Sequence, residues 1–248
     1  MITLPGVSAD PDVSPLSGTV ERASAKRQAL SVGLATGLYG ISFGALATTS
    51  GLSIIQAQIL SLVLFSGGSQ FAVVGVLGAG GSAASAIATS SLLGARNTFY
   101  ALRMAQILDV RGWRRLGAAH LTIDESTAVG TAQGSVMAQR LGFWLTGVTI
   151  FAGWNLMTLA GSVAGNSLGD PKRWGLDAAA SAAFLALLWP RLTARPAQVL
   201  AAAAVVIALS TSPFLTSGVP VILTIIAAFA VAAWVTRRRV APRERRAR

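Results

Sequence analysis

Long stretches of apolar residues without any charge dominate the pattern of this chain. No Asp, Glu, Lys or Arg occurs from residue 28 to residue 95, and further uncharged stretches cover residues 141–169 and 196–236. A helix needs about 20 predominantly apolar residues to cross the hydrocarbon core of a bilayer. The pattern therefore predicts membrane-spanning helices, at residues 30–49, 83–107, 141–161, 174–190, 197–211 and 219–236.

Two further apolar segments are interrupted or short. Residues 54–80 contain the sequence SGGSQ at 66–70, which leaves two arms of about 10–12 residues, each too short to span alone. We favour a broken or re-entrant helix with unwound backbone at SGGSQ; the alternative is one long helix whose small residues serve packing. The second segment, residues 118–133, is short and is expected to enter the membrane only partway.

Glycines recur along the first predicted helix. Gly33, Gly37, Gly40 and Gly44 follow one another at spacings of three or four residues, which places them on one face. Small residues allow helices to approach closely in lipid. We interpret this strip as a packing surface; the alternative is a face that leaves room for a substrate.

Composition and charge define the class of protein. Hydrophobic residues make up 53% of the chain and charged residues only 12%, against about 25% charged in average soluble proteins. The expected fold is all-α, a polytopic transmembrane bundle. The net charge of +11 does not indicate nucleic-acid binding, because seven of the 20 basic residues are clustered at 237–248 after an apolar helix. The chain has no cysteine, and we expect no cofactor and no metal.

The basic residues also predict the topology. Residues 1–28 form a polar segment whose basic residues, Arg22, Lys26 and Arg27, lie close to its end. Residues 29–236 form the transport domain, and residues 237–248 form a basic tail that contacts anionic lipid. Both termini are then expected to be cytoplasmic. The basic loop at 109–117 is also cytoplasmic if residues 54–80 and 118–133 both re-enter. That arrangement has six full crossings. If both segments span, there are eight, and the basic loop lies outside.

Several charged residues fall inside apolar segments, where a charge is costly and usually faces a polar pathway. Arg96, Tyr100 and Arg103 share one helix face. Arg103 lies near the helix end and is expected to snorkel, whereas Arg96 lies deeper and would pair with an acid, a backbone carbonyl or a substrate carboxylate. Asp124 and Glu125 are adjacent and cannot both face the same way, so one would serve the site.

Three weaker signals stand beside these. His120 and Asn155 are interpreted as packed polar residues; the alternatives are a ligand role for His120 and a substrate contact for Asn155. The sequence FAGW at 151–154 resembles FSGG at 65–68 and hints at a duplicated unit.

The motifs, taken together, resemble one known family. FSGGSQF at 65–71, GAGG at 78–81, LLGARNTFYALRMAQIL at 92–108 and AHLTIDES at 119–126 occur in this order, with YGISFGALATTSGLS at 39–53 before them. Over about residues 27–135 the chain resembles the AzlC family of large subunits of branched-chain amino acid permeases or exporters. Members commonly have Asn and His where this chain has Gly94 and Asn97, and LTDE where Ile123 lengthens the motif here.

This resemblance implies export of small hydrophobic amino acids across the bacterial cytoplasmic membrane. It also implies a small membrane partner, AzlD, of about a hundred residues. No phosphate-binding loop of the GxxxxGK[ST] type occurs, so energy would come from an ion gradient. A channel for a small neutral solute and a membrane-embedded enzyme are the alternatives.

The expected site serves a zwitterion with an apolar side chain. Arg96 or a half-helix N-terminus near residues 69–70 would bind the carboxylate. Asp124 or Glu125 would bind the ammonium group or carry a coupling proton. The candidate substrate-binding residues are Arg96, Asn97, Gly67, Gly68, Ser69, Gln70, Phe71 and Tyr100.

Overall fold

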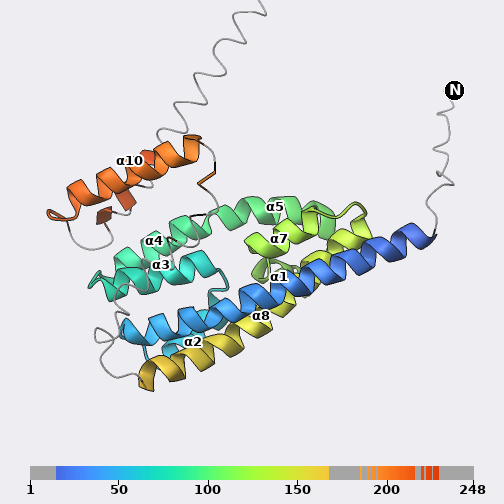
Figure 1. Ribbon diagram of the computed structural model, residues 1–248, viewed down its shortest axis with the longest axis horizontal. Helices are drawn as coiled ribbons and strands as arrows, with labels where there is room; N and C mark the ends of the chain where they lie inside the picture. Colours follow the sequence, from blue (N-terminus) through green and yellow to red (C-terminus); the bar gives the residue numbers. More distant parts are fainter. Residues whose placement is uncertain are drawn as a thin grey trace, which may run out of the picture. The chain divides into compact units, whose positions relative to one another are not determined.

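The secondary structure that can be described is helical throughout. In a computed structural model of the protein, the structure describes residues 15–167, 185, 189, 192–193, 195–215, 219–220, 222–224 and 226–228. No strand occurs among them. Along the chain (Figure 1), the helices are α1 (Pro15–Thr49), α2 (Ile54–Val63), α3 (Gly67–Gly78), α4 (Ala83–Gly94), α5 (Arg96–Leu108), α6 (Trp113–His120), α7 (Asp124–Thr131), α8 (Val136–Ser167) and α10 (Arg195–Thr211).

The chain divides into two compact units. Unit one takes its described residues from Met1–Leu38 and Phe99–Gly153, and unit two from Tyr39–Thr98 and Trp154–Arg248. Helices α1 and α8 contribute their N-terminal parts to unit one and their C-terminal parts to unit two. Each unit is described below by itself.

Two helices are long and apolar enough to cross a membrane by length and composition. They cover Gly18–Thr49 and Val136–Ser167 among the described residues. Helix α1 begins at Pro15, well before the start predicted at residue 30. The residues between these points include Glu, Arg, Lys, Gln and Ala, which are good helix formers, so the helix continues beyond its apolar part. The number of crossings stays a prediction.

Glycines allow α1 and α8 to pack closely. In unit two, a Cβ atom at Gly44 would overlap the carbonyl oxygen of Thr158, and one at Gly161 would overlap that of Ile41. In unit one, a Cβ at Gly33 would lie 2.7 Å from Cβ of Thr149. The glycine strip of the first helix is therefore a packing surface, as the first interpretation holds, because α8 fills the space beside it.

In unit two, residues 54–80 form a broken helical hairpin. Helix α2 ends at Val63 and α3 begins at Gly67. At the other end of the hairpin, a Cβ at Gly78 would lie 2.6 Å from Oγ of Ser50. The segment thus returns to the end where it began, and α4 runs back alongside α3 (Figure 1). The predicted break is confirmed, although it lies at residues 64–66 and Gly67 to Gln70 form the first turn of α3.

The helix predicted at residues 83–107 is divided in two. Helix α4 ends at Gly94 and α5 begins at Arg96, with Ala95 between them. Glycine is unfavourable inside a helix by about 1 kcal/mol relative to Ala, and the N–H of Thr98 bonds the carbonyl of Ala95 in a tighter i to i+3 turn. The prediction of one continuous helix is wrong here, and Arg96 opens a helix instead of lying inside one.

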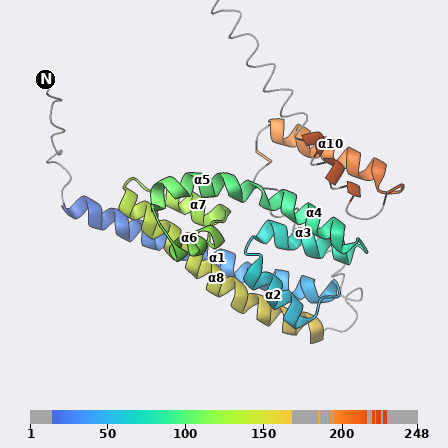
Figure 2. The ribbon, with the colours of Figure 1, turned by 180° about the vertical axis from the view of Figure 1, so that it is seen from behind.

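In unit one, residues 113–131 form a second hairpin of short helices, α6 and α7 (Figure 2). Part of the basic loop predicted at 109–117 is therefore helical. The break between the two helices packs on α8, where a Cβ at Gly147 would lie 3.0 Å from Cβ of Leu121. Near the start of α8, Arg140 donates to the carbonyl of Ile107 at 2.8 Å, and Gln139 donates to that of Gln133 at 3.0 Å. The chain thus enters and leaves this hairpin beside the same end of α8.

The C-terminal predictions are tested only in part. Helix α10 agrees with the prediction at 197–211. Of residues 219–236, positions 219–220, 222–224 and 226–228 are described and helical. The loop at 170–173, the helix at 174–190 apart from 185 and 189, and the basic tail at 237–248 lie outside the described residues.

Candidate functional site

The first turn of α3 in unit two starts at the break in the hairpin. Ser66 occupies the N-cap position in an extended conformation, but its side chain makes no capping hydrogen bond. The first N–H groups of a helix have no partner inside the helix, and they carry the positive end of its dipole. Gly67 and Gly68 follow directly and are half-buried. The break therefore presents positive backbone potential beside two residues without side chains.

Arg96 brings a cation to the same turn. The Nη2 atom of Arg96 lies 3.0 Å, and its Cζ atom 3.7 Å, from the position that a Cβ of Gly68 would occupy. The guanidinium thus takes the space that any larger residue at position 68 would need. Leu93 also contacts this position, with Cδ2 at 3.9 Å. Arg96 and the start of α3, which the sequence offered as alternative carboxylate sites, lie beside each other.

Ser69 joins this turn to α4. Its hydroxyl donates to the carbonyl of Ser90 at 3.1 Å, and a Cβ at Gly94 would lie 3.2 Å from its Oγ. Ser69 is fully buried. Because α4 leads through Ala95 into Arg96, this contact fixes the end of α4 against α3 and positions Arg96 over Gly68.

Gln70 stabilises the break and is fully buried. Its Nε2 donates to the carbonyl of Leu64 at 2.6 Å, one of the carbonyls at the end of α2. Its Oε1 accepts from Nε1 of Trp154 at 2.9 Å. A buried polar group without a partner is costly, so this side chain makes the break stable.

Phe71 belongs to an aromatic cluster in unit two. Its ring centroid lies 5.7 Å from that of Phe43 in an edge-on arrangement, 5.6 Å from Tyr39 and 6.3 Å from Trp154. Phe71 is fully buried. Both Gln70 and Phe71 thus lie behind the first turn of α3 and support its shape.

The two remaining candidates on α5 belong to different units. Asn97, in unit two, is half-buried, and its buried Oδ1 makes no hydrogen bond within the described part of the chain. Tyr100, in unit one, is half-buried.

Asp124 and Glu125 open α7 in unit one. Both are half-buried and stand in the first turn, where the helix dipole favours negative charge. The break before them is closed by Ser126, whose hydroxyl donates to the carbonyl of Leu121 at 2.6 Å and accepts from the N–H of Ile123 at 3.1 Å. The acids therefore follow a break that the sequence reading had not located.

His120 and Asn155 are packed polar residues, as interpreted from the sequence. The His120 ring stands edge-on to Phe151 in unit one, with centroids 5.5 Å apart. In unit two, Asn155 Oδ1 accepts from Nε2 of Gln58 at 3.3 Å. The FAGW sequence at 151–154 lies inside the continuous helix α8, so its resemblance to FSGG marks no second break.

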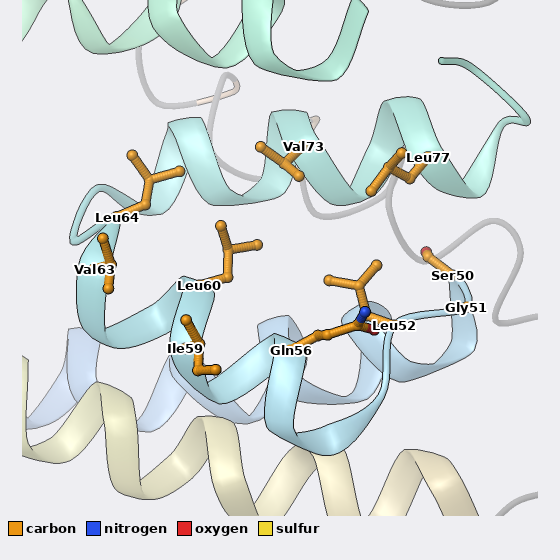
Figure 3. A pocket seen from close by; sticks show the side chains of 10 residues that line it. All are labelled: Ser50, Gly51, Leu52, Gln56, Ile59, Leu60, Val63, Leu64, Val73 and Leu77. Atoms are coloured by element: carbon orange, nitrogen blue, oxygen red, sulfur yellow. The ribbon is translucent and has the colours of Figure 1, made fainter. Parts of the chain in front are cut away.

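An apolar groove also lies in unit two, between α2, α3 and the turn before α2 (Figure 3). It faces away from Arg96, because at about 100° per residue Val73 and Leu77, which line it, stand about 140° and 180° around α3 from Gly68. The groove is therefore separate from the first turn. Its walls are Ser50, Gly51, Leu52, Gln56, Ile59, Leu60, Val63, Leu64, Val73 and Leu77.

The sequence reading missed three supporting residues. Leu93 and Ser90 on α4 and Trp154 on α8 shape the first turn of α3. Only the spacing of Ser90, Leu93 and Arg96, three residues apart, could have indicated a shared face. In the described part of the chain, no group of three His, Asp or Glu side chains could hold a metal ion.

Comparisons with known proteins identify the family of the chain. The family described as AzlC protein matches residues 31–168. A protein of Helicobacter pylori strain 26695 named "Uncharacterized membrane protein" is 34% identical over 92 residues, which are 37% of this chain and 40% of that protein. An Archaeoglobus fulgidus protein of the same name is 34% identical over 156 residues, which are 62% of this chain and 68% of that protein. The chain thus spans less than half of the Helicobacter relative. No solved structure matches it.

Proposed function

The chain belongs to the AzlC family of membrane proteins, and on this premise we propose that it is the large subunit of a secondary transporter. The proposed cargo is a small hydrophobic amino acid such as valine, leucine or isoleucine, exported across the cytoplasmic membrane. The AzlC family is associated with transport, which favours this reading over an enzyme.

One observation carries the proposal. The guanidinium of Arg96 lies against Gly68 in the first turn of α3, whose N-cap side chain makes no capping bond. A carboxylate near both would be attracted by the guanidinium and by the positive end of the helix dipole. A guanidinium also suits a carboxylate in particular, because it donates two parallel hydrogen bonds.

The surroundings suit a small apolar side chain. Gly67 and Gly68 carry no side chain of their own over the turn, and Leu93 offers an apolar contact at 3.9 Å from the Cβ position of Gly68. Gln70 and Phe71 would act behind the site as supports. The apolar groove is not part of the binding site in this proposal, because it opens on the opposite face of α3.

Asp124 and Glu125 in unit one would carry the coupling proton. Acids that follow a helix break inside an apolar bundle are the usual position for such a role. We further propose that transport requires a small AzlD-like membrane subunit, and that both termini are cytoplasmic.

Efflux from preloaded cells tests the proposal. Radiolabelled valine, leucine and isoleucine are followed in cells that express the chain with and without the neighbouring small membrane protein. We expect export only with the partner, and its loss in Arg96→Ala and in Asp124→Asn. Arg103→Ala is the matched control, since Arg103 lies on the same helix and is exposed. Export that is unchanged in Arg96→Ala, at equal amounts of protein in the membrane, would contradict the assignment.

A further inference from the structure

The start of α6 in unit one exposes an unusual combination of side chains. Trp113 is 78% exposed and Leu116 is 75% exposed, and Arg111, Arg114 and Arg115 beside them are exposed as well. We call these five residues the α6 surface. A tryptophan can bury about 150–250 Å² of surface, so leaving one in water beside an exposed leucine forfeits a large apolar contribution.

The geometry of α6 directs its apolar side away from the unit. Ala118 is 5% exposed and marks the side that packs on the unit. At about 100° per residue, Trp113 and Leu116 lie only about 60° apart, whereas each stands about 140–160° from Ala118. His120, which ends the helix and contacts Phe151 on α8, stands about 20–40° around α6 from Trp113 and Leu116, so the last turn of that face contacts α8. The first turn of the helix therefore exposes Trp113 and Leu116 on the side away from Ala118.

Two arginines stand about 100–160° around α6 from Trp113 and Leu116, at positions 114 and 115, and Arg111 precedes the helix. The guanidinium carbon of Arg114 lies 5.9 Å from the centre of the Trp113 ring, within the range of a cation–π contact. Asp109 is the acid in the same stretch, so residues 109–116 carry three positive charges and one negative charge. Arginine has a planar fork of donors that matches phosphate, on a long apolar stem that lies along apolar surface.

We propose that the α6 surface binds anionic phospholipids at the membrane interface. Tryptophan is enriched at the level of the head groups because one part of it is apolar and the other polar. Trp113 and Leu116 would enter the boundary of the acyl chains, and the three arginines would bind the phosphates above them. An acidic protein segment would match the charges, but it would leave the apolar face uncovered.

This contact would anchor the second hairpin. Helix α6 leads directly into the break at residues 121–123, and Asp124 and Glu125 follow it. A fixed depth for α6 therefore sets the depth at which the first turn of α7 lies. The inference needs a membrane protein, but it does not depend on which solute the protein carries.

Spin labelling tests the depth of the α6 surface. The chain has no cysteine, so a single spin label at Leu116→Cys reports one site in the full-length protein in nanodiscs. In bilayers with phosphatidylglycerol, we expect the label to be accessible to oxygen and shielded from a water-soluble nickel reagent. In bilayers of phosphatidylcholine alone, we expect several-fold greater exposure to the nickel reagent.

A triple variant tests the role of the charges. Arg111→Gln, Arg114→Gln and Arg115→Gln together should remove the difference between the two bilayers. The matched control removes three exposed cations from α1, with Arg22→Gln, Lys26→Gln and Arg27→Gln, and should keep the difference.

Three results would overturn the proposal. The first is a label at position 116 that is open to the nickel reagent in anionic bilayers. The second is equal shielding in both bilayers, which would show insertion without selection of the head group. The third is shielding that requires a co-purified protein.

Discussion

At the scale of single residues, two leucines show how the hairpins stay broken. The carbonyl of Leu64 accepts from Gln70 at 2.6 Å, and that of Leu121 accepts from Ser126 at 2.6 Å. In each hairpin, a polar side chain from the first turn of the second helix satisfies a carbonyl at the end of the first. In a bilayer, where no water can satisfy backbone groups, such contacts allow irregular backbone inside the protein.

Replacing Gln70 tests this support. Gln70→Leu replaces the amide by an apolar side chain of similar size and leaves the Leu64 carbonyl and the Trp154 N–H unsatisfied. At about 1–3 kcal/mol for each of the two unsatisfied groups, we expect a loss of about 2–6 kcal/mol in the free energy of unfolding, measured as a lower melting temperature in detergent. Gln106→Leu, at an exposed position of α5, should leave the melting temperature nearly unchanged. Equal melting temperatures for the two variants would contradict a supporting role for Gln70.

Substitutions at two adjacent glycines distinguish an effect on substrate binding by Arg96 from a general effect on the stability of the turn. In Gly68→Ala, the new methyl group would lie 3.0 Å from Nη2 of Arg96 and displace the guanidinium, whereas in Gly67→Ala it would lie 3.4 Å from Cη2 of Trp154, an ordinary contact. Both changes add the same atoms to the same helical turn. We therefore expect Gly68→Ala to raise the KM for leucine about tenfold or more, and Gly67→Ala to change it little. The measurement is saturable leucine efflux, and an equal change of KM in both variants would argue against a role for Arg96.

At the scale of elements, each broken helix returns to the end where it began. Helices α2 and α3 have 10 and 12 residues, about 15 and 18 Å at 1.5 Å per residue. Neither reaches across a hydrocarbon core of about 30 Å. The contact between Gly78 and Ser50 closes the first hairpin at its base, and the six-crossing topology needs this geometry.

Cysteine labelling distinguishes a hairpin from a span. Ser53→Cys, before α2, and Ala84→Cys, in the first turn of α4, are both exposed positions in a chain without cysteine. A membrane-impermeant maleimide should label both positions from the outer face of cells. It should label Ser24→Cys, near the start of α1, only in inverted vesicles. Labelling of positions 53 and 84 from opposite faces would show that the segment between them crosses the membrane.

The sequence predicted one of the three breaks, and the reason lies in the residues. Two glycines between serines interrupt an apolar run at 66–70 and were visible as a pattern. The break at Ala95 follows the single residue Gly94, which helices in proteins often tolerate. The break at 121–123 has no glycine or proline; Thr122 bonds the carbonyl of Ala118 at 2.7 Å, and the acids that follow are favoured at a helix start.

The candidate site was predicted only in part, because its geometry depends on contacts between helices. The sequence offered Arg96 and the start of α3 as alternatives, and it did not predict that they lie beside each other. The burial of Gln70 and Phe71 depends on contacts with α8, about 80 residues away in the sequence. Periodicity shows which residues share a face, but it does not show which helix that face meets.

At the scale of the whole molecule, large apolar side chains remain exposed along the long helices. On α1, Leu34 and Leu38 are each 61% exposed, and on α8 Leu156 is 62% exposed. Contiguous exposed apolar surface marks contact with lipid or with another protein. Glycines and buried hydroxyls face inward instead, as in membrane proteins whose helices associate through small residues.

The central claim is that the first turn of α3 and Arg96 recognise the carboxylate of a small hydrophobic amino acid. Leucinamide tests it most directly, because it keeps the side chain and the ammonium group of leucine and replaces only the carboxylate by a neutral amide. In proteoliposomes that contain the chain and its partner, we expect unlabelled leucine to inhibit the exchange of labelled leucine, and leucinamide to do so at least about a hundredfold more weakly. If leucinamide inhibits as well as leucine, the carboxylate is not what this site recognises.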